Sequence, residues 1–159
     1  MISPDASFDV ISAGLSWLYF DVSVMIPKVL RLLRADGCLV LTNLIWLPQM
    51  DPIAQRSEEL VLNHHPAWGG AGYNGVIPPV ASWAREHFNL RTFHVMEAPL
   101  QFTREAWRGR IRASRGIGAS LPAEAVDKFD AEHRTLLEAI APDTFTVLHQ
   151  MTIHAYARK

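Results

Sequence analysis

The sequence predicts an α/β fold built on a partly parallel sheet, and three observations lead to this prediction. The run CLVLTNLIW at 38–46 is almost continuously apolar, which is typical of a strand covered on both faces. With the residues before it, this run forms a strand–helix–strand unit over 8–46. Strand-like and helix-like segments then continue to alternate along the chain, in the order β-α-β-α-loop-α-β-α-α-β.

The opening unit consists of three short segments. Phe8–Ser12 is a strand-like run that ends in a small-residue turn. Apolar residues then recur at helical spacing over Met25–Leu33. We expect Ser23 to cap this helix and Gly37 to end it in the left-handed conformation.

The rest of the chain predicts four more helices and two more strands. We expect the helices over 51–65, 80–88, 103–116 and 122–141, with Asp51, Thr103 and Ser120 as caps of the first, third and fourth. A glycine-rich, aromatic loop covers 66–79. The strands are expected over 90–98 and 144–159. The last of them, expected to be antiparallel, places apolar side chains at the odd positions Phe145, Val147, Met151, Ile153 and Ala155.

Composition indicates one globular domain over residues 1–159. The chain is 49% hydrophobic and 19% charged, with a formal net charge of −1, which gives it no electrostatic reason to bind nucleic acid or an anionic membrane. Cys38 is the only cysteine, so neither an internal disulfide nor a cysteine-based zinc site can form. No apolar run reaches the length of about 18 residues that a membrane span needs. We therefore expect a cytoplasmic protein without a metal site.

Two stretches of the chain resemble class I S-adenosylmethionine-dependent methyltransferases. They are PDASFDVISAGLSWLYFD at 4–21 and KVLRLLRADGCLVLTN at 28–43. A third stretch, EAWRGRIRASRGIGASLP at 105–122, is similar to one subgroup of the small-molecule branch with the methyltransferase-11 type domain. The resemblance extends over essentially the whole chain and implies the C-terminal half of the family's fold.

The resemblance also implies how the strands are arranged. In the family the SFDV strand is the fourth, so this chain would supply strands equivalent to 4-5-7-6, the last one antiparallel. Helices would cover both faces of this partial Rossmann-like sheet, and 100–142 would be a helical lid insertion. The glycine-rich cofactor loop and the acidic residue that holds the ribose precede this part of the fold and are not found in the sequence. The opening strand would then have an unpaired edge, to be covered by self-association or by a partner.

The resemblance implies a cofactor-binding role for the turn after the opening strand. In the family this turn borders the methionine end of S-adenosylmethionine, which corresponds here to Ala13, Gly14, Leu15 and Trp17. Small residues at 13 and 14 let the backbone approach a ligand closely. A tight turn with Trp17 in the core is an equally open interpretation. Leu15 and Leu18 stand where relatives have Gln and His, and no catalytic residue is assigned.

Six further residues are candidates for the acceptor side. Asn43 and Trp46 end the second strand, where α/β sheets place their ligand crevice. The aromatic loop at 66–79 and the preceding helix end add possible pocket walls, and the resemblance puts the 103–116 helix over the acceptor pocket. The candidates are Asn43, Trp46, His64, Trp68, Trp107 and Arg108.

Structural roles are open for the same residues. The tryptophans could fill the core, His64 could be a solvated helix end, and the arginines of 103–116 could pair with the acidic helix at 122–141. His149 and His154 are five apart on a strand, hence on opposite faces, and neither is expected to be a ligand.

The sequence leads to two hypotheses of function. The first is an S-adenosylmethionine-dependent methyltransferase portion that acts on a small molecule. The alternative is a catalytically inactive methyltransferase-like fragment that serves as a dimerising or scaffold module. A third idea, nucleic-acid binding by the arginine-rich helix, is disfavoured by the net charge of −1.

Overall fold

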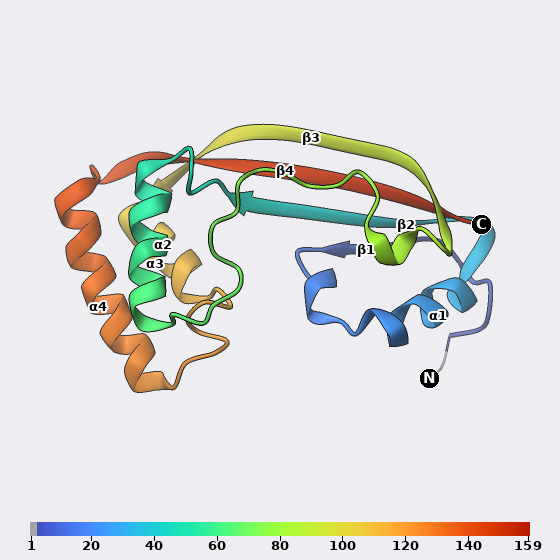
Figure 1. The fold of residues 1–159 in the computed structure, drawn as a ribbon, viewed down its shortest axis with the longest axis horizontal. Helices are drawn as coiled ribbons and strands as arrows, with labels where there is room; N and C mark the ends of the chain where they lie inside the picture. The colour runs from blue at the N-terminus through green and yellow to red at the C-terminus, as the bar shows by residue number, and fades with distance from the viewer. Residues whose placement is uncertain (1–2) are drawn as a thin grey trace. The chain divides into compact units, whose positions relative to one another are not determined.

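The computed structural model describes residues 3–159 and contains one mixed, four-stranded sheet (Figure 1). Its strands are β1 (Phe8–Gly14), β2 (Leu33–Trp46), β3 (Phe88–Thr103) and β4 (Thr144–Arg158). Their order across the sheet is β1-β2-β4-β3. β1 and β2 are parallel, and β4 runs antiparallel to its neighbours. The predicted α/β class, strand order and antiparallel last strand are therefore confirmed.

β1 lies at one end of the sheet. It pairs with β2 in parallel, with Ala13 opposite Leu41 and Gly14 opposite Thr42. Because β1 has no other neighbour in the strand order, its second edge pairs with no strand among residues 3–159. The unpaired edge that the resemblance implied is present in this part of the chain.

The described chain divides into two compact units. Unit 1 contains the described residues up to Ile45, together with Ile77–Met96 and Gln150–Lys159. Unit 2 contains Trp46–Val76 and Glu97–His149. No helix among the described residues combines the length and the apolar character that a membrane span requires.

Unit 1 is built around helix α1 (Val22–Leu32), whose Ile26 and Val29 are buried. Other buried members of this core include Leu39, Leu41 and Tyr156. These side chains come from the two sheet strands β2 and β4, so α1 packs its apolar face against the sheet.

Both expected ends of α1 were wrong. Asp21, not Ser23, caps the helix, because its carboxylate accepts both the backbone N–H of Ser23 at 2.9 Å and its hydroxyl at 2.6 Å. The helix ends at Leu32, and Gly37 lies inside β2. Gly37 is closely packed there, because a Cβ at this position would lie 3.0 Å from the carbonyl oxygen of Arg34.

The helix predicted over 80–88 is also wrong. Only the 3-10 turn η2 (Ser82–Ala84) forms there, and β3 begins at Phe88. The backbone N–H of Ala81 donates to the Tyr156 hydroxyl at 3.3 Å, and Phe88 is buried in the unit 1 core. These two contacts tie both ends of the segment to the unit 1 core.

Unit 2 packs the helices α2 (Pro52–His64), α3 (Arg104–Arg112) and α4 (Ala123–Ile140) around a buried core. The Asp51 cap is confirmed by bonds from the N–H groups of Ile53 and Ala54, both 3.0 Å. The Thr103 cap is confirmed by a bond of 3.1 Å from the N–H of Ala106.

Ser120 does not cap α4, contrary to expectation. Its hydroxyl donates to the carbonyl of Arg115 at 2.7 Å, and the helix begins after Pro122 without a side-chain cap.

The side of β4 that is buried changes within the strand. Phe145, Val147 and His149 are buried at odd positions, whereas the buried residues after Gln150 include Thr152, His154 and Tyr156 at even positions. In the second half of β4 the apolar odd positions are thus not the buried ones. His149 and Gln150 are consecutive and both buried, so the alternation of buried and exposed residues shifts by one position there. Such a shift exchanges the two faces of a strand.

Candidate functional site

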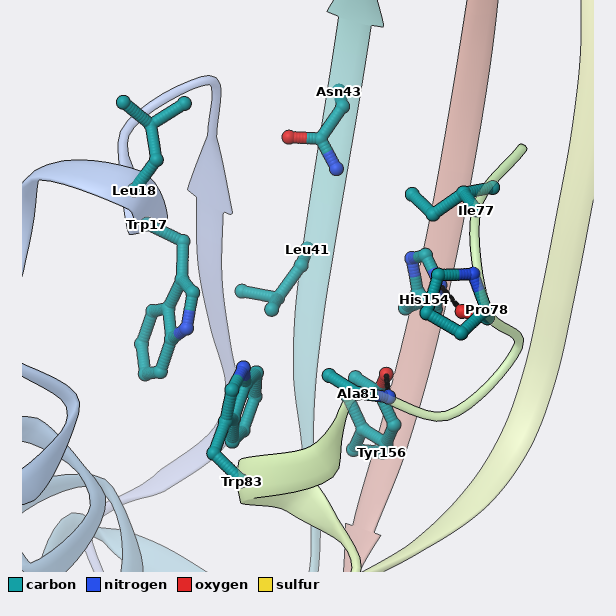
Figure 2. A pocket seen from close by; sticks show the side chains of 10 residues that line it. All are labelled: Trp17, Leu18, Leu41, Asn43, Ile77, Pro78, Ala81, Trp83, His154 and Tyr156. Atoms are coloured by element: carbon teal, nitrogen blue, oxygen red, sulfur yellow. Dashed lines mark hydrogen bonds between the residues drawn. The ribbon is translucent and has the colours of Figure 1, made fainter. Parts of the chain in front are cut away.

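A cavity of about 170 Å³ lies in unit 1 beside the turn that follows β1. Figure 2 shows side chains that face it from β2, from β4, from the 77–83 segment and from the 3-10 turn η1 (Trp17–Tyr19). The lining residues are Trp17, Leu18, Leu41, Asn43, Ile77, Pro78, Ala81, Trp83, His154 and Tyr156. None of the ten is Asp, Glu, Lys or Arg.

Aromatic side chains form much of the wall. The rings of Trp17 and Trp83 are 5.1 Å apart, and Trp83 contacts Tyr156 nearly edge-on at 5.6 Å. His154 stacks on Tyr156 with an interplanar angle of 11°. A wall of this kind offers dispersion contacts and flat surfaces to a ligand.

Several of the lining residues carry uncharged polar atoms. Asn43 donates from Nδ2 to Thr152 Oγ1 at 3.2 Å, so its amide oxygen remains as an acceptor. The buried indole Nε1 of Trp17 has no hydrogen-bond partner among the described residues. The Tyr156 hydroxyl accepts the N–H of Ala81, and burial raises the pKa of Tyr156. The cavity therefore pairs an apolar wall with a few uncharged polar groups.

The turn predicted to border the cofactor has an unusual backbone. Leu15 adopts φ of 54°, in the left-handed region that leucine rarely occupies, while its N–H donates to the Thr42 carbonyl at 2.9 Å. A Cβ on Gly14 would lie 3.3 Å from Thr42 Oγ1. This turn is strained and closely packed, and it leads into Trp17 at the cavity wall.

The structure brings two of the predicted site residues, Trp17 and Asn43, together at the cavity. Ala13 pairs within the sheet and packs beside the unit 1 core, so of the predicted cofactor turn only Trp17 lines the cavity. The other acceptor-side candidates, Trp46, His64, Trp68, Trp107 and Arg108, belong to unit 2.

The unit 2 tryptophans have structural contacts. Trp46 donates from Nε1 to Glu58 at 3.0 Å and lies under the guanidinium of Arg110, 5.5 Å from its ring. Trp68 packs against the unit 2 core. Trp107 is fully buried and donates to Ser57 Oγ at 2.9 Å.

The charged candidates of unit 2 form ion pairs. Arg108 is buried and bonds to both Glu105 and Asp130, and Arg112 reaches Asp130 at 3.1 Å. Burial raises the pKa of Asp130, but the hydrogen bonds and charges of the two arginines outweigh this and hold it below its usual value. The predicted pairing of the arginine-rich helix with the acidic helix is confirmed.

His64 is not the solvated helix end that the sequence suggested. Its Nε2 lies 2.8 Å from Glu132, and only 11% of its side chain is exposed. The pKa of Glu132 is lowered mainly by this hydrogen bond.

Sequence reasoning missed the residues on β4 that face the cavity. His154 and Tyr156 are separated by two positions, which places them on the same face of a strand. Trp83 was also missed, because its segment was predicted as a helix. The spacing of His154 and Tyr156 was the available signal, and His154 was compared only with His149.

No family model matches the chain, and no curated protein does. Among solved structures, a protein assigned as a type II methyltransferase from Anaeromyxobacter dehalogenans matches 96% of this chain with a TM-score of 0.55 and 16% identity. The chain spans 66% of that protein's length, slightly less than two thirds. A protein from Bacillus halodurans, also assigned as a methyltransferase, is similar over the whole of this chain, which covers 67% of that protein's length, with a TM-score of 0.48 and 15% identity.

Proposed function

We propose that this chain, which has the fold of class I methyltransferases, takes part in S-adenosylmethionine-dependent methyl transfer to a small molecule. The observation that carries the proposal is the cavity beside the β1 turn. It brings Trp17, from the turn that the resemblance assigns to the cofactor side, together with Asn43, which was expected on the acceptor side.

The cavity fits an acceptor better than it fits the whole cofactor. Its volume of about 170 Å³ is below the range of roughly 300–1,000 Å³ that is usual for sites of complete cofactors and drug-sized ligands. None of its ten lining residues is a carboxylate that could hold ribose hydroxyls. We therefore assign the cavity to the methyl acceptor. The contact of Ala13, Gly14, Leu15 and Trp17 with S-adenosylmethionine stays a prediction.

The residues of this chain would position the acceptor, while S-adenosylmethionine would supply the activated methyl group. Methyl transfer requires the two reactants to be held in line, and it needs a base only for acceptors that lose a proton. The apolar wall around Trp17 and Trp83 can exclude water from such a contact, and Asn43 can orient a polar group of the acceptor.

Calorimetric titration with S-adenosylhomocysteine tests cofactor binding by this chain. Micromolar affinity would support a self-sufficient enzyme and would exclude the inactive-fragment alternative. Absence of binding up to millimolar concentration would exclude a self-sufficient enzyme. Trp17→Ala should weaken the binding if the predicted turn contacts the cofactor, whereas His94→Ala, on the exposed part of β3, should leave it unchanged.

A second candidate function is a dimerising or scaffold module, and the exposed edge of β1 favours it. Phe8 and Val10 on this strand are 41% and 56% exposed. An apolar strand with a free edge is a surface on which another strand can add.

A further inference from the structure

We propose that the unit 1 cavity binds a neutral, single-ring aromatic molecule with a hydroxyl group, a phenol, and that His154 accepts the hydroxyl hydrogen. This inference rests on the proposed function where it names the class of methyl acceptor. The binding itself can be measured without any methyl transfer.

The size and the walls of the cavity suit one aromatic ring. An apolar cavity of about 150 Å³ is large enough to bind benzene, and this one measures about 170 Å³. Trp17, Trp83 and Tyr156 contribute aromatic surfaces, and Leu41 lies between them in Figure 2. Aromatic rings pack favourably in offset or edge-to-face contact, so a planar ligand is preferred over a bulky aliphatic one.

The position of His154 indicates which polar group the aromatic ring of the ligand should carry. Its Nε2 lies 3.4 Å from the carbonyl oxygen of Pro78. Because a carbonyl oxygen only accepts, Nε2 carries the proton of the neutral imidazole, and Nδ1 is left as an acceptor. In Figure 2, the nitrogen that is not bonded to Pro78 is on the side of the ring toward Leu41 and Asn43.

Packing holds this imidazole in place. Its ring stacks on Tyr156 at 5.7 Å and lies 4.7 Å from the ring of Phe93. Nδ1 is therefore a fixed acceptor, which a hydroxyl group can satisfy and an ether cannot. If the hydroxyl ionises, the O–H bond breaks, its electron pair stays on oxygen and the proton bonds to Nδ1. The imidazolium then keeps its Nε2–H bond to Pro78.

The absence of formal charge on the wall selects against ionic ligands. None of the ten lining residues is an acid, a lysine or an arginine, so a carboxylate or an ammonium group would lose its hydration without a counter-charge. The amide oxygen of Asn43 can accept one hydrogen bond from a second uncharged substituent.

Titrations with phenol, anisole, benzene and benzoate, followed by tryptophan fluorescence and by the NMR signals of the histidine rings, test the proposal. The wild-type chain should bind phenol roughly 5- to 10-fold more tightly than anisole or benzene, the effect of about 1 kcal/mol from one net hydrogen bond. Benzoate should bind most weakly. His154→Phe should bring phenol affinity down to the level of benzene, and benzene binding should persist. His94→Phe, on an exposed part of β3, is the matched control and should change none of these affinities.

The proposal is overturned if phenol does not bind, if anisole or benzoate binds as tightly as phenol, or if His154→Phe retains the preference for phenol. Should His154→Phe fail to fold, the comparison of phenol with anisole on the wild-type chain still decides. Phenol binding without methyl transfer in the presence of S-adenosylmethionine would leave this inference standing and would exclude a self-sufficient methyltransferase. Methyl transfer to another acceptor without phenol binding would overturn this inference alone.

Discussion

At the scale of single residues, Ser57 is the centre of a buried polar group in unit 2. Its hydroxyl donates to the carbonyl of Ile53 at 2.8 Å and accepts the indole N–H of Trp107. The Nε2 atom of His133 lies 3.0 Å from the same oxygen. Since the only hydroxyl hydrogen is used on Ile53, His133 donates from Nε2, and its buried Nδ1 has no partner among the described residues. This environment favours the neutral imidazole.

The free energy of unfolding should therefore decrease as the pH is lowered from about 6.5 to about 4, the range in which an ordinary histidine would gain a proton. Burial is the main cause that lowers the pKa of His133, to about 4, and the nearby Asp130 only partly opposes it. At a pH below 6.5, the ordinary pKa of histidine, His133 binds a proton in the unfolded chain but stays neutral in the folded chain until the pH approaches 4. The contribution to stability is complete above about pH 6.5 and is lost progressively toward pH 4, up to about 3 kcal/mol.

Urea unfolding between pH 7.5 and pH 4 measures this loss. His133→Gln should reduce the slope of stability against pH, although His149, whose pKa burial also lowers, keeps part of it. His87→Gln is the control, because the His87 side chain is 36% exposed. Equal slopes in the wild type and His133→Gln would contradict the assignment of His133 as a buried neutral histidine.

At the scale of elements, Asp51 joins the start of α2 to β4. One carboxylate oxygen caps the helix through the N–H groups of Ile53 and Ala54, and the other accepts the N–H of Leu148 at 2.8 Å. The cap of α3 is simpler, because within residues 3–159 the side chain of Thr103 accepts only the N–H of Ala106. The Asp51 cap thus has one more bond from a helix N–H than the Thr103 cap and, in addition, a bond to a strand.

This difference predicts unequal costs for two alanine substitutions. Thr103→Ala should lower the free energy of unfolding by about 1 kcal/mol, the usual effect of a lost cap. Asp51→Ala should cost about 2–4 kcal/mol, because it also leaves the Leu148 N–H without its acceptor. Chemical denaturation of both variants gives the comparison. A cost for Asp51→Ala no greater than that for Thr103→Ala would show that the bond to β4 adds nothing to stability.

The same caps show which parts of the fold could be predicted. Asp51 and Thr103 were identified from the sequence because a cap needs only its own three following residues. The short helix predicted over 80–88 failed because the contacts of Ala81 and Phe88 with distant Tyr156 decided that segment. Local spacing contains no information about such long-range contacts.

Some residues of the candidate site could also be predicted from the sequence, and others could not. Asn43 was predicted because α/β sheets place their ligand crevice at the ends of the strands, whereas Trp17 was predicted only from the family resemblance. No site role was predicted for His154, because its separation of five residues from His149 puts the two histidines on opposite faces of a regular strand. The faces exchange at His149 and Gln150, and only the packing in the folded chain shows that.

At the scale of the whole molecule, many large apolar side chains are exposed in β1, whose outer edge is unpaired among the described residues, and in the segment that follows it in the sequence. They come from β1, the turn after it and the first turns that follow. The exposed residues are Phe8, Val10, Leu15, Leu18, Tyr19, Phe20 and Val24. Scattered exposed apolar residues are ordinary, but seven of them within residues 8–24, which include a strand with an unpaired edge, are typical of an association surface.

We therefore expect the chain to self-associate through β1, and Val10→Lys should convert it to a monomer. Val10 is 56% exposed, so a lysine loses little burial there while it places a charge on the strand edge, which opposes strand addition. Val76→Lys is the matched control, because Val76 is 75% exposed and lies outside β1. Sedimentation velocity over a range of concentrations should show a dimer for the wild type and Val76→Lys and a monomer for Val10→Lys. A wild-type chain that stays monomeric at all concentrations, or a Val10→Lys variant that still dimerises, would exclude β1 as the association surface.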